Sequence, residues 1–179
     1  MQELLHVSVE LVKLLDKTAD ATLPKQIVDV VKLHSKLAVG SAWIPVPGAD
    51  VAAGAANIWS MYARINGKIG IPLKENVLKS IGAGVATNLT SYIAMSGVAS
   101  AMKFIPGIGS VGGALIMSAS LYAVTLVSGW VYLKALCLMV QRNGGEINAS
   151  DFKQAIDQVL SDKGLIKRLI KVAKKEYKE

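Results

Sequence analysis

Two long uncharged stretches dominate the middle of the chain. Residues 80–102 and 104–133 contain no Asp, Glu, Lys, Arg or His, and Lys103 stands between them. A helix needs about 20 mainly apolar residues to cross a bilayer, and both stretches reach that length. The segment 103–110 is rich in turn-forming residues. The pattern therefore predicts an apolar helical hairpin over residues 80–133.

A second hairpin is predicted ahead of the first. Helices are expected over about 24–43 and 50–69, because prolines disfavour helical backbone in the residue before them and glycine permits a tight turn. Asp50 is expected in the first turn of the second helix, where a carboxylate faces the positive end of the helix dipole. Asp50 and Arg64 bracket 13 uncharged residues, too few for a straight crossing of a bilayer. We expect this hairpin to pack in protein or to lie at an interface.

The two ends of the chain are amphipathic. Apolar residues recur at helical spacing over 2–18, with charged residues between them. Near the other end, Ser150 is expected to cap a helix, Gly164 is expected to break it, and a lysine-rich helix follows. The predicted fold is all-α, with two tandem hydrophobic helical hairpins that turn at Ile-Pro-Gly motifs. The predicted units are an N-terminal amphipathic helix (1–23), the double hairpin (24–142) and C-terminal basic helices (143–179).

The two turns repeat one motif, 61 residues apart. The sequence reads WIPVPGAD over 43–50 and KFIPGIGS over 103–110. The turn residues are Ile44, Pro45, Pro47, Gly48 and Asp50 in the first hairpin and Ile105, Pro106, Gly107 and Gly109 in the second. Together with the Gly-rich helices, over about residues 36–140, these turns resemble the YcjF-like, GTPase-associated helical domain of unknown function. That resemblance implies a helical fold and membrane association, with no established activity.

Small residues in these helices predict close helix packing. Ser96 and Ser100 are four residues apart, and Gly109 and Gly113 have GxxxG spacing, which lets helices approach closely. We therefore expect helix–helix contacts there and a homo-oligomer. Asp50 has two interpretations: a residue satisfied by backbone amides at a helix start, or a group that titrates on membrane contact.

No motif in the chain identifies a reaction. The phosphate-binding pattern GxxxxGK[ST] is missing, so any GTPase is expected to be a separate partner. Residues 107–112 match GxGxxG, but no strand is predicted before them and no acidic residue lies between Glu75 and Glu146. His6 and His34 lack metal-ligand spacing and are expected at surfaces or helix boundaries. We expect no enzymatic activity, no metal and no cofactor.

Positive charge gathers at the C-terminal end. The chain is 52% hydrophobic and 18% charged, with a net charge of +7, and residues 163–179 supply +5 of it. Contact with anionic lipid and a solvated helix face both fit this pattern. Nucleic acid is not expected as a partner, because Tyr177 is the single aromatic residue there. The candidate lipid contacts are Lys163, Lys167, Arg168, Lys171, Lys174 and Lys175.

The function expected from these patterns is that of a non-enzymatic, membrane-associated helical protein that scaffolds or remodels a membrane. A separate GTPase is a possible partner in trans. A colicin-like channel former that inserts into membranes and a soluble helical interaction or oligomerisation module are the alternatives. Basic residues flank the 80–133 stretch on both sides, so we expect the inner or cytoplasmic membrane, with both termini cytoplasmic.

Overall fold

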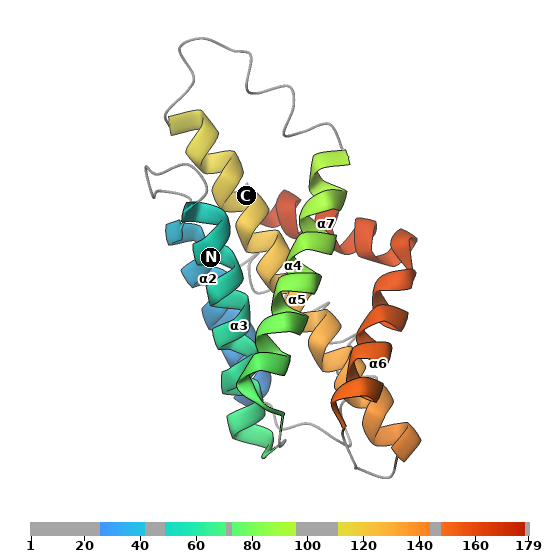
Figure 1. The fold of residues 1–179 in the computed structure, drawn as a ribbon. Helices are drawn as coiled ribbons and strands as arrows, with labels where there is room; N and C mark the ends of the chain where they lie inside the picture. Colours follow the sequence, from blue (N-terminus) through green and yellow to red (C-terminus); the bar gives the residue numbers. More distant parts are fainter. Residues whose placement is uncertain (1–25, 42–48, 71–72, 96–110, 144–147, 178–179) are drawn as a thin grey trace.

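The computed structural model describes residues 26–41, 49–70, 73–95, 111–143 and 148–177. These residues form six helices and no strand, which confirms the all-α prediction for the described part of the chain (Figure 1). The helices are α2 (Gln26–Ser41), α3 (Ala49–Ile69), α4 (Glu75–Met95), α5 (Val111–Asn143), α6 (Ala149–Ser161) and α7 (Lys163–Tyr177).

Helix α5 is the centre of the molecule. It is the longest described helix, at 33 residues, and it packs against each of the other five. In Figure 1, α2 and α3 lie on one side of α5, α4 crosses it, and α6 and α7 lie on its other side. Its sequence explains this position, because a helix that is apolar all round has to be covered on all sides in water.

Contacts along α5 show the directions of its neighbours. Tyr62 and Asn66 of α3 bond Ser128 and Tyr132 of α5, so residue numbers rise together and the two helices run parallel. Helix α2 runs antiparallel to α5: its Val31 lies against Gly129, whereas its later residue Val39 accepts a hydrogen bond from the earlier Ser118. The chain thus packs α2 against two helices, α3 and α5, that run opposite to it.

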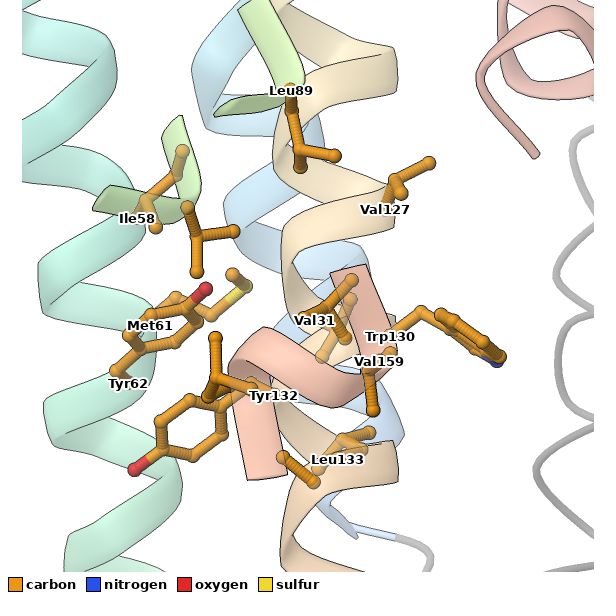
Figure 2. Close-up of a cluster of buried hydrophobic side chains, with 14 of the residues drawn as sticks. Val31, Ile58, Met61, Tyr62, Leu89, Val127, Trp130, Tyr132, Leu133 and Val159 are labelled. Atoms are coloured by element: carbon orange, nitrogen blue, oxygen red, sulfur yellow. The ribbon is translucent and has the colours of Figure 1, made fainter. Parts of the chain in front are cut away.

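The helices share one hydrophobic core (Figure 2). Met61 and Tyr62 of α3, Leu133 of α5 and Phe152 of α6 are all at most 1% exposed and belong to the same cluster of buried side chains. Helix α7 adds Ile166, which is also fully buried. The basic C-terminal helices are therefore part of the bundle in the described structure.

Two predicted helix boundaries are wrong. Asn148, and not Ser150, caps α6: its side-chain oxygen accepts a hydrogen bond from the backbone N–H of Asp151 at 2.9 Å. The break after α6 lies at Asp162, and not at Gly164. Its carboxylate oxygen accepts from the backbone N–H of Leu165 at 2.9 Å and so caps α7. In both places a short polar side chain satisfies free amide groups at a helix start, as N-cap residues do.

Most of the predicted turn and packing residues lie outside the described residues. This holds for Ile44, Pro45, Pro47, Gly48, Ser96, Ser100, Ile105, Pro106, Gly107 and Gly109. Asp50 lies in the first turn of α3 and Gly113 in the first turn of α5. The two Ile-Pro-Gly turns and the hairpins that they would form stay predictions.

One described helix is long and apolar enough to cross a membrane by length and composition. It is the segment Ser118–Met139 of α5, and 83% of its most apolar window is buried inside the bundle. The described part of the other predicted arm, in α4, does not pass the same test. Thr87 and Asn88 of α4 are exposed polar residues that lower its hydropathy. In the described structure, most of the apolar surface of α5 is therefore covered by the other helices.

Candidate functional site

The basic helix α7 has two different faces. Its apolar residues Ile166, Leu169 and Ile170 are buried against the bundle. Lys163, Lys167 and Arg168 are exposed on the opposite side, and these described side chains have no ion-pair partner among the described residues. Burial of one face therefore directs a row of uncompensated positive charge outward.

The remaining candidate lipid contacts belong to the same helix. Lys171, Lys174 and Lys175 lie within α7, one to three turns after Lys163 and Lys167. They continue the series of basic residues that Lys163, Lys167 and Arg168 begin along this helix. The neighbouring helix α6 presents both signs of charge to solvent. The positive surface among the C-terminal helices is therefore concentrated on α7.

A buried polar layer joins α3 to α5 in the middle of the core. The Tyr62 hydroxyl lies 2.6 Å from the Ser128 hydroxyl and donates to the Ser128 carbonyl oxygen at 3.2 Å. One turn further on, the Tyr132 hydroxyl donates to the side-chain oxygen of Asn66. The two tyrosine rings stack with their centroids 4.0 Å apart. This layer was not predicted from the sequence, although each helix carries its two polar residues at i and i+4, the spacing that places them on one face.

Burial also determines the chemistry of this layer. Desolvation raises the pKa of Tyr62 and of Tyr132 far above the ordinary tyrosine value. Both hydroxyls therefore stay protonated near neutral pH and act as hydrogen-bond donors, not as bases. The layer fixes the register of α3 against α5, because a one-turn slip would leave buried polar groups without partners.

His34 does not lie at a surface, contrary to the expectation from the sequence. It is 3% exposed and bridges α2 to α3. The Asn57 side-chain N–H donates to the His34 carbonyl oxygen at 2.8 Å, which leaves the Asn57 side-chain oxygen to accept from His34 Nδ1, also at 2.8 Å. This pair is a helix-to-helix clamp. Among the described residues, no three His, Cys, Asp or Glu side chains are grouped so that they could hold a metal ion.

Cys137 is buried in α5. Its side chain is 2% exposed, and desolvation raises the pKa of its thiol above the ordinary value. A buried thiol that stays protonated is a poor nucleophile. Its position is that of a small apolar core residue, and it adds no reactive group to the basic surface of α7.

The comparisons with known proteins point to a membrane-associated relative. The chain is 31% identical over 120 residues to magnetosome membrane protein 22 of Magnetospirillum gryphiswaldense. The match covers 66% of this chain, and the chain spans 59% of the length of that curated relative. No family model matches the chain, and no solved structure matches it. The resemblance to the YcjF-like domain stays a prediction.

The similarity and the fold agree at a coarse level. The relative is named as a membrane protein, and the described part of this chain is helical with one apolar helix of membrane-crossing length. These findings are consistent with a membrane-associated helical protein.

Proposed function

We propose that this protein binds the surface of an anionic membrane as an intact helical bundle, through the basic face of α7. The observation that carries the proposal is the division of α7 into a face buried in the core and a face of exposed basic side chains. The similarity to a magnetosome membrane protein supports a membrane as the partner. Clusters of basic residues next to an anionic leaflet gain about 1 kcal/mol of binding free energy per residue.

The way in which the protein binds a membrane follows from the burial of the apolar face of α7 in the core. An amphipathic helix that lies in a bilayer interface places its apolar face among the acyl chains. In α7 that face, which includes Ile166 and Leu169, is occupied by the core. Through α7 the intact bundle therefore offers charge and no apolar face, so attachment by this helix is peripheral and sensitive to salt. Raising the ionic strength from about 0.1 M to about 1 M shortens the Debye length from about 10 Å to about 3 Å and should release it.

The test is sedimentation with vesicles that contain anionic lipid, compared with purely zwitterionic vesicles. Neutralising three exposed basic residues of α7, by Lys163→Gln, Lys167→Gln and Arg168→Gln, removes about 3 kcal/mol of attraction and should weaken binding about 100-fold. The matched control neutralises three exposed basic residues outside α7: Arg64→Gln and Lys68→Gln on α3, and Lys74→Gln just before α4. It changes the net charge equally and should bind nearly as the parent does. Equal losses in both variants would mean that overall charge, and not α7, attracts the membrane.

A second candidate function is insertion of α5, as in a colicin-like channel former. The observation in its favour is the apolar segment Ser118–Met139, which amphipathic helices cover. Insertion would require α3 to leave α5 and the Tyr62–Ser128 and Asn66–Tyr132 bonds to break. Surface binding needs neither step.

Trp130 distinguishes the two functions. It lies on α5 and is 4% exposed (Figure 2). In a Trp43→Phe, Trp59→Phe background it is the remaining tryptophan of the chain. Vesicles with bromine deep in the acyl chains should leave its fluorescence unchanged if the bundle stays closed. Strong quenching would establish insertion of α5 and refute the peripheral model.

The proposal places the whole bundle on one side of the membrane, so both termini lie on the side of the leaflet that it binds. Anionic lipid is concentrated on the cytoplasmic leaflet, which makes that leaflet the proposed location. Scaffolding or remodelling of the membrane, with self-association or a separate GTPase, is a further step that we propose on the resemblance to the GTPase-associated domain. Addition of GTP or ATP to the isolated chain should produce no binding heat in calorimetry, because the phosphate-binding loop is missing.

A further inference from the structure

One apolar patch on the described surface stands apart from the core. Leu33 is 43% exposed and Leu37 is 54% exposed, and they are the large apolar side chains that the described residues leave open to solvent. They lie four residues apart on α2, so they point to the same side. Asp29 and Lys36, both exposed, flank them on that helix. We call these four residues the α2 outer face.

We propose that the amphipathic segment 2–18 of this same chain folds back as a helix and covers the α2 outer face. The segment ends eight residues before Gln26, where α2 begins. Connections of two to eight residues are usual between antiparallel neighbouring helices. The segment has 17 residues and α2 has 16, so the two would match in length at about 1.5 Å per residue.

The register of such a hairpin places apolar residues opposite apolar residues. In this antiparallel pair Thr18 lies beside Gln26, and residue numbers rise along α2 as they fall along the segment. A residue a few positions after Gln26 therefore lies beside the residue the same number of positions before Thr18. Leu33 then lies beside Leu11, about 10 Å along the helix axis from the position of Gln26 and Thr18. Leu37 lies level with Val7. Burying these side chains removes apolar surface from water on both helices, which drives the association.

The charges of the two partners are complementary in the same register. With Val7 and Leu11 facing α2, Lys17 and Glu10 lie at the edge of that face. Asp29 then comes near Lys17, and Lys36 comes near Glu10. Each pair joins opposite charges, which favours the antiparallel direction of the two helices. A register displaced by half the length of the helix would separate these charge pairs. A second copy of the chain or a lipid surface would have no reason to require these particular pairs. The inference is independent of membrane binding by α7, which lies on another part of the molecule.

Hydrogen exchange on the full-length chain tests the inference. An isolated helix of this length is marginal in water, so slow exchange of the amides of residues 4–15 would report docking. We expect protection in the parent chain and a loss of about 10-fold or more in a Leu33→Glu, Leu37→Glu variant. The matched control is Ala83→Glu, Thr87→Glu, which places the same two charges one turn apart on the exposed face of α4 and should change nothing in residues 4–15. Near-ultraviolet circular dichroism from the buried tyrosines checks that both variants keep the core.

Three results would overturn the inference. Residues 4–15 that exchange freely in the parent chain would mean that no helix covers the face. Protection that persists in the α2 variant would place the segment elsewhere. Protection that falls on dilution would mean that a second copy covers the face.

Cross-linking tests the direction in a Cys137→Ser background. A short bis-maleimide should join cysteines placed at Glu10 and Lys36, and likewise at Lys17 and Asp29. The mismatched pair at Lys17 and Lys36 should remain unlinked, and preferential linking of that pair would refute the antiparallel register.

Discussion

Replacing Gly129 with alanine should destabilise the bundle, although alanine is the better helix former. Gly129 of α5 lies against Val31 of α2. A Cβ atom added there would lie 2.5 Å and 2.8 Å from the two methyl carbons of Val31 and 3.2 Å from the sulfur of Met61. Carbon atoms in ordinary contact lie about 3.5–4.0 Å apart, so the methyl carbons would have to move by about 1 Å.

The magnitude follows from two opposing contributions. Gly→Ala inside a helix gains up to about 1 kcal/mol of folding free energy. Overpacking a well-packed core costs about 1–3 kcal/mol. Val31 is 5% exposed and β-branched, so its χ1 angle in a helix has essentially one favourable value and it cannot turn aside. The flexible Met61 can adjust, so the clash with Val31 decides the result, and we expect a net loss of about 1–2 kcal/mol.

Two further variants separate the clash from helix propensity. Gly84 lies on the exposed side of α4, with nothing within 4 Å of an added Cβ. Gly84→Ala should therefore stabilise the protein by about 0.4–1 kcal/mol. Val31→Ala alone creates a cavity, but combined with Gly129→Ala it makes room for the new methyl group. The double variant should lose at least about 1 kcal/mol less than the sum of the single losses.

The assay is urea unfolding followed by far-ultraviolet circular dichroism. The difference in unfolding free energy is taken between each variant and the parent chain. Strictly additive losses for Val31→Ala and Gly129→Ala would refute the reasoning, because they would mean that the two residues do not touch. A gain in stability for Gly129→Ala equal to that for Gly84→Ala would refute it as well.

Alkaline pH should weaken the fold through the buried tyrosines. Because burial raises the pKa of Tyr62 and Tyr132 in the folded chain, the unfolded chain releases these protons first, from about pH 10 upward. The contribution of the two tyrosines to the free energy of unfolding is complete below pH 10. Above pH 10 it should fall by up to about 1.4 kcal/mol per pH unit for each tyrosine. Urea unfolding at pH 8 to 11 measures this fall, and an unfolding free energy that does not change over that range would contradict the burial of the tyrosines. The cap of α6 predicts a further contrast: Asn148→Ala should cost about 1 kcal/mol, whereas Ser150→Ala should cost much less, and equal losses in thermal unfolding would count against Asn148 as the cap.

Hydrophobic periodicity in the sequence determined the helical class of this protein. A chain with helical spacing of apolar residues and no sustained alternation has no pattern from which to build a sheet, and the described residues contain none. The two faces of α7 were also readable, because apolar and basic residues follow helical spacing there. Local patterns carry such information because neighbouring residues on one helix face are only three or four positions apart.

The sequence predicted the ends of the helices less well than it predicted the helices themselves. Ser150 and Gly164 are plausible signals, but Asn148 and Asp162 hold the caps. Several residues within two or three positions of each other carry capping side chains, and the one that is used depends on how the helix packs below it. In α6, which begins at Ala149, Phe152 is the first buried side chain.

Only the tertiary structure showed where the apolar helix α5 lies and what covers it. A helix that crosses a membrane and a helix at the centre of a bundle have the same apolar composition, because each is surrounded by apolar groups and not by water. The partners that cover it come from distant parts of the chain: Tyr62 meets Ser128 and Asn66 meets Tyr132, each across 66 positions. No local pattern encodes that pairing, nor does it encode the burial of His34. Those outcomes depend on which helix faces fit together, and that is a property of the folded chain as a whole.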